Sequence, residues 1–253
     1  MNKTELEKKL TALYQPRLFK DYAPNGLQVE GKDQINKIVT GVTASMALIE
    51  AAIAKQADAI IVHHGYFWKG ERPEVVGMKY RRLSALIKND INLFGYHLPM
   101  DAHLLVGNNA NLARALGVES LRPLESEKPL EESIGVVGKL AVPLSPEAFQ
   151  MLVEKVVGRE VLFEAVSDSH ISDVALCTGG AQGYIDKALA ANADVFITGE
   201  VSEQTIHTAR EEGIHFCAAG HHATECFGPK ALAQHINDVW GIDCEFIDIP
   251  NPA

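Results

Sequence analysis

Two stretches of this chain repeat one order of residues, and both lead into side chains that bind metal ions. Residues 57–64 begin with Ala-Asp, continue as an apolar run and end in His-His, whereas residues 193–200 begin in the same way and end in Gly-Glu. Each stretch is followed by a histidine that has an acid four residues later, His97 with Asp101 and His221 with Glu225. The repetition predicts a site built between two related halves.

The spacing of apolar residues predicts an α/β fold of two similar lobes. Short β-branched runs alternate with amphipathic segments in both halves, which is typical of mostly parallel sheets covered by helices. Strands are expected at residues 38–42, 59–63, 91–96, 174–177, 195–198, 214–218 and 244–249. Helices are expected at residues 6–13, 79–88, 108–116, 185–191, 202–212 and 229–239, with another that follows Thr43 or Ser45 and ends near residue 54.

A third stretch interrupts the repeat. Its pattern is strand, helix, strand at residues 134–142, 146–157 and 161–163, and Pro, Ser and acidic residues flank it. We therefore expect a small inserted α+β subdomain that covers the site or makes subunit contacts. The expected division is a first α/β lobe over residues 1–120, an inserted α+β segment over 121–170 and a second α/β lobe, packed with the first, over 171–253.

The histidines follow the ends of predicted strands. Sites in open α/β sheets form at the carboxyl ends of strands, so His63, His64, His97 and His221 are expected to converge. The alternative is two duplicated halves whose polar strand ends never meet. Adjacent strand residues point to opposite faces, so His63 and His64 serve one site only if the strand ends there. Otherwise each binds a different metal of a pair, or one ring packs while the other is solvated.

Five residues together predict a metal centre. A tetrahedral zinc site needs four ligands, so five ligands with two carboxylates able to bridge fit two metals better. Zinc, manganese, iron, cobalt and nickel all suit mixed imidazole and carboxylate ligation. His97 is expected to orient Asp101 or to ligate, and Glu200 takes the repeat position of His64. The five expected ligands are His63, His64, Asp101, His221 and Glu225.

Helix geometry separates the two histidine–acid pairs. His221 and Glu225 share one face if residues 220–227 begin a helix, because residues four apart are neighbours on a helix surface. Pro99 lies between His97 and Asp101 and favours a turn there.

Aromatic residues directly follow the His-His pair. Tyr66, Phe67 and Trp68 precede Lys69, and an aromatic wall beside a cation can hold a heterocycle and a phosphate. The alternative is an aromatic cluster that buries a loop or a subunit contact.

Composition disfavours several classes of partner. The formal net charge of −10 opposes non-specific binding to nucleic acid, which needs a basic surface. Residues 1–10 are polar and lack the apolar core of a secretory signal, and no apolar run approaches the ~20 residues that span a bilayer. The four cysteines form no Cys-x-x-Cys pair and are expected to be buried free thiols. We therefore expect a cytoplasmic protein with no membrane partner.

Five motifs resemble those of a known family. They are Pro-Asn-Gly-Leu-Gln-Val at 24–29, Ile-Val-His-His-Gly at 61–65, the His97 to Asp101 segment, Ile-Thr-Gly-Glu at 197–200 and Gly-His-His-Ala-Thr-Glu at 220–225. The chain resembles, over essentially its whole length, the GTP cyclohydrolase type 2 homologue family, also called the Ngg-interacting-factor-like family. The resemblance implies two similar α/β lobes with a dinuclear metal site in the cleft between them. It also implies ligation by the same five residues and a ring-shaped homohexamer, a trimer of dimers.

Two classes of function follow from these residues. The first is a metal-dependent hydrolase of a small nucleotide-like substrate, which opens a purine ring as the GTP cyclohydrolase resemblance implies or hydrolyses a phosphoester. His97 or Glu200 would then shuttle the proton. The second is a non-enzymatic metal-binding scaffold or regulatory protein, in which the same ligands hold a structural or sensed metal. Direct binding to nucleic acid is disfavoured by the charge.

Overall fold

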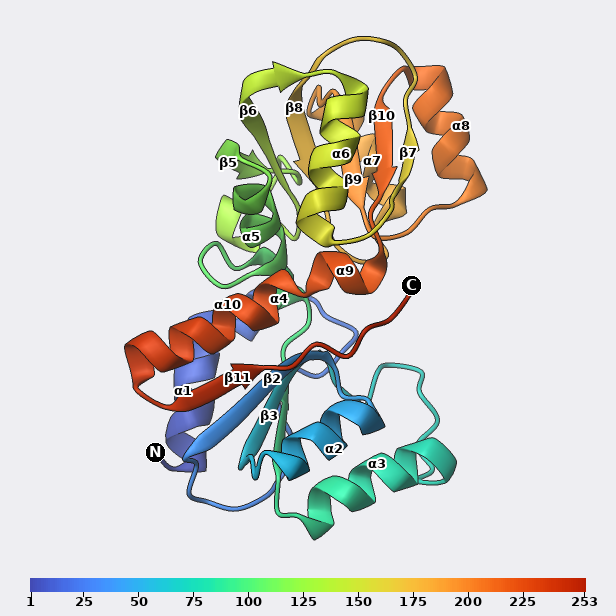
Figure 1. Cartoon of the computed structure of the whole chain (residues 1–253). Helices are drawn as coiled ribbons and strands as arrows, with labels where there is room; N and C mark the ends of the chain where they lie inside the picture. Colours follow the sequence, from blue (N-terminus) through green and yellow to red (C-terminus); the bar gives the residue numbers. More distant parts are fainter. The chain divides into compact units, whose positions relative to one another are not determined.

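The eleven strands of the chain form two sheets, one in each of two units (Figure 1). The computed structural model describes residues 1–253. The first unit comprises Met1–Met100 and Gly228–Ile249, and the second comprises Asp101–Phe227 and Pro250–Ala253. The chain therefore has the mixed α/β fold that its sequence predicts.

The first unit holds a five-stranded sheet in the order β1-β4-β3-β2-β11. Strands β4, β3, β2 and β11 run parallel, and β1 pairs antiparallel with β4 at the edge. Its strands are β1 (Gly26–Val29), β2 (Lys37–Thr43), β3 (Ala59–His64), β4 (Asn92–Gly95) and β11 (Asp243–Phe246). Its helices are α1 (Lys3–Tyr14), the 3-10 turn η1 (Pro16–Leu18), α2 (Met46–Ala54), α3 (Gly77–Lys88), α10 (Phe227–His235) and a π-helical turn, η4 (Ile236–Trp240).

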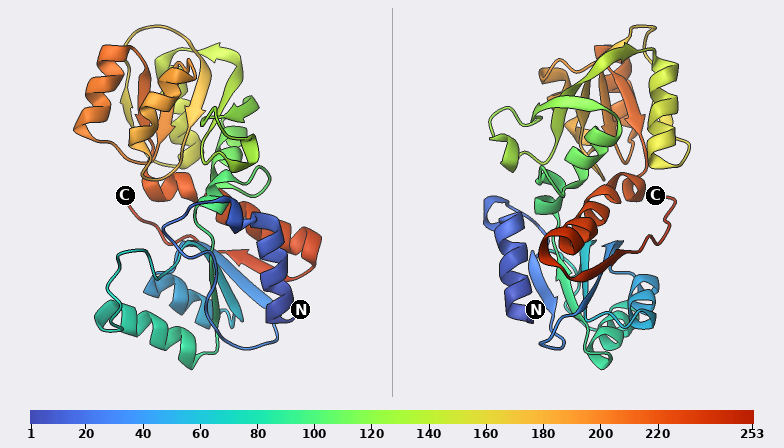
Figure 2. Two further views of the ribbon diagram at one scale, coloured as in Figure 1. Left: turned by 180° about the vertical axis from the view of Figure 1, so that it is seen from behind. Right: turned by 60° about the vertical axis from the view of Figure 1, so that its left-hand side comes forward.

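Helices cover both faces of this sheet (Figures 1 and 2). Alternate strand residues point to opposite faces, and Val39 and Ile60 pack with Leu48 of α2 and Leu86 of α3. Helix α10 lies on the other face, where its Pro229 carbonyl accepts a hydrogen bond from the buried Thr40 hydroxyl. The core of this unit thus consists of two apolar layers, one between each face of the sheet and its helices. These layers fix the positions of β3 and β4.

The second unit holds a six-stranded sheet in the order β5-β6-β8-β9-β10-β7. Strands β8, β9 and β10 run parallel, and the other three pair antiparallel. Its strands are β5 (Val118–Pro123), β6 (Val136–Leu144), β7 (Leu162–Glu164), β8 (Ile171–Leu176), β9 (Val195–Thr198) and β10 (His215–Ala218). Its helices are α5 (Asn108–Ala115), α6 (Pro146–Val157), α7 (Ile185–Ala190), α8 (Glu203–Glu212) and α9 (His221–Glu225), with 3-10 turns η2 (Leu130–Glu132) and η3 (Gln182–Tyr184).

Two apolar clusters fill the two faces of the second sheet. Helices α5 and α6 pack on one face, with Leu112 and Phe149 among the buried residues. Helices α7 and α8 pack on the other, with Ala188 and Ala209 against Phe196. Ser202 caps the start of α8, because its hydroxyl accepts a hydrogen bond from the Thr205 N–H.

The segment predicted as an inserted subdomain belongs to the second sheet. Strand β6 pairs with β8, and β7 pairs with β10 at the opposite edge. Strand backbone groups need partners, and the two outer parallel strands of this sheet offer them. The expectation of a separate α+β subdomain at 121–170 is therefore wrong.

The unit boundaries differ from the predicted lobes 1–120 and 171–253. Strand β11 pairs in parallel with β2, so residues 228–249 complete the first sheet rather than the second. Residues 101–120 lie in the second unit. Sequence order alone does not show which sheet edge a terminal strand will join.

The repeated Ala-Asp pairs have the same structural role in both units. The Asp58 carboxylate accepts hydrogen bonds from the N–H groups of Asn36 and Lys37, where β2 begins. The Asp194 carboxylate accepts from Ser172 and Asp173 in β8. Each aspartate thus ties the start of one parallel strand to the start of the next. A common origin of the two units stays a prediction.

Two further features concern the helices. The segment after β4 forms the short helix α4 (Leu98–Ala102) rather than the predicted turn. Pro99 is its second residue, and the N–H groups of the first turn of a helix have no partner within the helix, so proline is tolerated there.

No helix in the structure combines the length and apolarity needed to cross a bilayer.

Candidate functional site

Three histidines of the first unit gather at the carboxyl ends of β3 and β4. The ligand nitrogens of His63, His64 and His97 lie within 4.8 Å of one another. The ring centroid of His63 is 4.5 Å from that of His64 and 5.1 Å from that of His97. Strand β3 ends at His64, so the two adjacent imidazoles turn toward one site despite the strand alternation.

The surroundings of these rings fix which nitrogen carries the lone pair. Nδ1 of His63 lies 3.2 Å from the Tyr96 carbonyl oxygen, and Nδ1 of His97 lies 2.8 Å from the Asp21 carboxylate. Both partners only accept, so Nδ1 donates in both rings and Nε2 holds the lone pair. Nδ1 of His64 lies 3.2 Å from the Thr43 hydroxyl. Such partners commonly orient histidines that bind metals through the other nitrogen.

Gln28 positions the loop that follows the histidines. Its amide oxygen accepts a hydrogen bond from the Tyr66 N–H, and its amide nitrogen donates to the Pro24 carbonyl. A Cβ at Gly65 would lie 2.1 Å from the Gln28 amide oxygen, and one at Gly95 would lie 2.5 Å from its nitrogen. Both glycines are therefore required for this side chain to lie between the ends of β3 and β4.

Only one of the three aromatic residues after the histidines borders them. The Trp68 ring centroid lies 5.8 Å from that of His64 and 4.9 Å from that of His97. Tyr66 is buried, with its hydroxyl donating to the Ala44 carbonyl, and Phe67 lies beneath the Lys79 ammonium group. The aromatic partner of Trp68 is instead Tyr22, at 5.5 Å.

In the second unit, His221 lies between two carboxylates. Its Nδ1 is 2.7 Å from Glu200, which follows β9, and its Nε2 is 3.1 Å from Glu225, one turn along α9. The predicted shared face of His221 and Glu225 is thus present. The Glu225 and Glu200 hydrogen bonds outweigh burial and raise the pKa of His221 to about 9. In the absence of a metal a proton supplies the positive charge that this group of acids favours.

Gly179 makes room for this cluster. It follows β8 with a φ of +72°, and a Cβ there would lie 2.2 Å from a Glu225 carboxylate oxygen. Its N–H donates to the Thr224 hydroxyl, which in turn donates to the His221 carbonyl. The Gly179 turn therefore holds α9 through its backbone and leaves space only for the two ligand side chains.

Asp101 lies in a hydrogen-bond network of the second unit, and its ligand oxygen is within 4.8 Å of that of Glu225. One carboxylate oxygen accepts from the Asn108 amide at 2.9 Å and from the Thr178 hydroxyl at 3.1 Å. Asn109 supports this arrangement, because its side chain bonds both the Asp101 carbonyl and the Thr178 backbone. Asp101 is 7% exposed, so these donors hold its carboxylate in a defined orientation.

The donor set fits a divalent metal ion. Imidazole and carboxylate ligands suit zinc and its first-row neighbours. The four histidines each have Nδ1 within hydrogen-bond distance of a protein group, as histidines that bind metals through the other nitrogen usually do. The structure therefore contains groups of His, Asp and Glu that are able to bind metal, and it does not choose the ion.

Two residues at the site were not predicted from the sequence. Asp21 holds His97 from 76 residues away, and Tyr22 borders Trp68. The only sequence signal nearby is the Pro-Asn-Gly turn at 24–26, which directs this segment back toward β4. Of the predicted residues, Glu200 contacts His221, and His97 contacts the His63–His64 pair.

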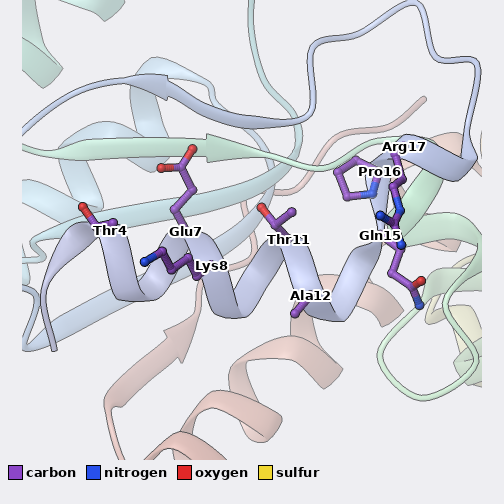
Figure 3. Close-up of a pocket in the computed structure, with 8 residues that line it drawn as sticks. All are labelled: Thr4, Glu7, Lys8, Thr11, Ala12, Gln15, Pro16 and Arg17. Carbon is purple, nitrogen blue, oxygen red and sulfur yellow. The ribbon is translucent and has the colours of Figure 1, made fainter.

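A pocket of about 570 Å³ lies along α1 and η1 and shares no lining residue with these clusters (Figure 3). Figure 3 shows that most of its side chains project from α1, whereas Pro16 and Arg17 belong to the following turn η1. Glu7 is its only acid, and it holds no histidine or cysteine, so it has no metal-binding set. Its lining residues are Thr4, Glu7, Lys8, Thr11, Ala12, Gln15, Pro16 and Arg17.

The chain belongs to the DUF34/NIF3 (NGG1p interacting factor 3) family, whose model matches residues 1–252. A relative from Pseudomonas aeruginosa is 56% identical over 93% of this chain and 92% of its own length. Another from Haemophilus influenzae is 54% identical over the full length of both chains. Both are called "GTP cyclohydrolase 1 type 2 homolog".

Solved structures share the whole fold. The protein ybgI, described as of unknown function, is 51% identical and superposes with a TM-score of 0.94 over 100% of both chains. TTHA1606 from Thermus thermophilus is 34% identical with a TM-score of 0.90, again over 100% of both chains. The family expected from the sequence motifs is thus confirmed, together with its mixed α/β fold.

Proposed function

We propose that this protein is a dinuclear metal-dependent hydrolase of a small nucleotide-like substrate. The observation that carries the proposal is the histidine cluster of the first unit, where three imidazoles converge and His63 and His97 present Nε2. The proposed ligands of two divalent ions are His63, His64, Asp101, His221 and Glu225. Their donor types and their hydrogen-bonded orientation support this set.

The proposed chemistry divides between metal and protein. When bound, two divalent ions would act as Lewis acids and lower the pKa of a coordinated water. His97 would take up or return a proton at Nε2, because its Nδ1 is held by Asp21. Glu200 was expected to share that role, but its contact with Nδ1 of His221 supports an orienting role instead.

Two rings beside the histidines support a planar substrate. Tyr22 is 55% exposed, and its ring lies 5.5 Å from that of Trp68 and 5.0 Å from that of His97. The Trp68 indole is fixed by its donation to the Gly65 carbonyl, and the Lys69 N–H ties the loop to the Tyr22 carbonyl. Fixed, partly exposed aromatic rings favour stacking with a heterocycle.

The relatives' name is consistent with a nucleotide substrate. We propose either opening of a purine ring, in which one water adds to the imidazole carbon and opens the ring to a formamide and a second water releases formate, or hydrolysis of a phosphoester. Both reactions consume water at an electrophilic centre, which the same residues are able to serve.

The decisive experiment measures metal and turnover together. Protein purified without chelator is analysed for bound metals, and GTP and bis(4-nitrophenyl) phosphate are tested with the metals found. We expect two ions per chain, and His64→Ala and Asp101→Ala should each lower metal content and abolish turnover. His207→Ala, on the exposed surface of α8, is the matched control. Equal turnover in a demonstrably metal-free double variant would overturn the proposal.

Metal without turnover would favour the alternative of a non-enzymatic metal-binding scaffold. Saturated metal coordination in a crystal would support that interpretation, whereas open coordination positions would support catalysis. The proposed assembly is a homohexamer, a trimer of dimers, and light scattering should then give the mass of six chains. The negative charge continues to disfavour nucleic acid as a partner.

A further inference from the structure

Asp21 lies beneath His97 with all of its acceptor capacity used. Its side chain is 3% exposed, and one oxygen lies 2.8 Å from Nδ1 of His97. That oxygen also accepts from the Ala23 N–H, and the other accepts from the Asn25 amide and the Leu98 N–H, each at 3.0 Å. All four partners are donors, so Asp21 serves only as an ionised acceptor.

These contacts hold the backbone and the ring of His97 at once. The Asn25 amide oxygen accepts the His97 N–H at 2.8 Å, while Asp21 holds the ring and the next N–H along the chain. The rings of Tyr22 and Trp68 pack against the same ring in T-shaped arrangements, with centroid distances of 5.0 and 4.9 Å. The imidazole therefore has little freedom to rotate or to exchange its two nitrogens.

The electrostatics of Asp21 agree with this geometry. Burial alone would raise the pKa of Asp21, but the hydrogen bonds from His97 and Asn25 outweigh burial and lower it to about 2. The carboxylate is thus charged throughout the physiological range. A fixed negative charge at Nδ1 keeps the proton on that nitrogen and directs Nε2 to the other histidines.

We propose that Asp21 is a positioning residue that locks His97 in the Nδ1–H tautomer and directs its Nε2 toward the His63–His64 pair. The role of that Nε2 in catalysis rests on the proposed function, whereas the tautomer itself does not. An amide at position 21 could not replace the carboxylate. Its NH₂ group would face either Nδ1 of His97 or the N–H of Leu98.

The first test reads the tautomer directly in the full-length, metal-free protein. Histidine is labelled with ¹⁵N, long-range ¹H–¹⁵N spectra are recorded, and the His97 signals are assigned by their loss in His97→Gln. We expect proton-bearing Nδ1 and proton-free Nε2 in the wild type. The opposite tautomer in the wild type would overturn the proposal, and circular dichroism of His97→Gln establishes that the variant used for assignment is folded.

The second test uses Asp21→Asn beside Asp33→Asn, the same change at an exposed position of the same unit. Circular dichroism first establishes that each variant is folded. We expect Asp21→Asn to shift His97 toward the Nε2–H tautomer and Asp33→Asn to leave it unchanged. An unchanged His97 tautomer in folded Asp21→Asn would contradict the proposal.

Turnover then separates this proposal from the proposed function. With GTP or bis(4-nitrophenyl) phosphate as probe, Asp21→Asn should lower kcat by roughly 100-fold or more with little change in KM, as wrong-tautomer variants of other histidine enzymes do. If the wild type turns over a substrate and Asp21→Asn has the same kcat, the positioning role is wrong. If the metal-loaded wild type shows no turnover, the proposed hydrolase function is wrong. The proposed role of Asp21 is still supported in that case if His97 is found in the Nδ1–H tautomer.

Discussion

Gly179 is the residue at which backbone freedom and site chemistry meet. Its φ of +72° disfavours any side chain, and its missing Cβ leaves room for a Glu225 oxygen that would otherwise be 2.2 Å away. The two requirements are independent, because one concerns the local backbone and the other concerns α9. Substitutions are able to separate them.

We predict that Gly179→Ala weakens metal binding by roughly 10-fold or more and lowers the free energy of unfolding by about 1–3 kcal/mol. The new methyl group would displace the Glu225 carboxylate. Metal titration and urea unfolding measure the two effects.

Two controls accompany this variant. Gly213→Ala has the same positive φ, of +75°, but an open environment, so it reports the backbone cost alone. Gly183→Ala lies in the same loop with nothing near its Cβ position and should change neither quantity. If Gly179→Ala binds metal as tightly as Gly213→Ala, the steric explanation is wrong.

At the scale of elements, single carboxylates organise the starts of strands and the ends of loops. Asp58 and Asp194 each accept two N–H groups of a neighbouring strand. Glu125 binds Lys128, Lys187 and the Ile134 N–H, and so ties the segment after β5 to α7. These contacts place the polar strand ends at a common edge in each unit.

We predict that Asp194→Ala lowers the free energy of unfolding by about 1–3 kcal/mol, because two N–H groups of β8 lose a charged acceptor. Chemical denaturation gives the value. Asp168→Ala, the same change at an exposed position, is the control and should cost less than about 0.5 kcal/mol. Equal costs for the two variants would argue against this role of the carboxylate.

Glu125 should give the second unit a measurable acid sensitivity. Burial alone would raise the pKa of Glu125, but the Ile134 N–H and the two lysines hold it below the usual 4.5. A group whose pKa is lower in the folded state stabilises the fold above its unfolded pKa, and that stabilisation is lost as the pH falls.

We therefore predict that Glu125→Gln costs about 1–3 kcal/mol at pH 7 and that the cost shrinks as the pH falls below about 4.5. Urea unfolding of wild type and variant over a pH series measures the difference. A cost that stayed constant down to pH 3 would show that the ion pairs do not matter.

At the scale of the molecule, each unit has its own apolar core, and each contributes side chains that are able to bind metal. A ligand that binds only the folded state stabilises it in proportion to the logarithm of its concentration over Kd. Metal removal should therefore affect the stability of the chain as a whole.

We predict that chelation of a metal held at about 100 times its Kd lowers the free energy of unfolding by roughly 3 kcal/mol. Thermal unfolding before and after chelator treatment, followed by readdition of metal, tests this. The His64→Ala and Glu225→Gln variants, one from each unit, should both show a smaller response than the His207→Ala control. A melting temperature that is unchanged by the chelator would rule out metal-linked stability.

The sequence by itself predicted the parallel strands of both sheets, most of the helices and the side chains that we propose as metal ligands. The apolar runs predicted β3, β9 and their parallel neighbours, since burial on both faces leaves a continuous hydrophobic pattern. The spacing of His221 and Glu225 predicted a shared helix face, because helix periodicity is a local property. The family motifs are equally local, and they identified the family correctly.

Only the tertiary structure decided how distant segments meet. It paired β6 and β7 with the second sheet and β11 with the first, because an open sheet edge accepts any strand that reaches it. It also brought Asp21 to His97 across 76 residues and placed Gln28 between two glycines. Such contacts depend on the path of the whole chain and leave no periodic signal, so the tautomer of a key histidine is set by a residue that its own motif does not contain.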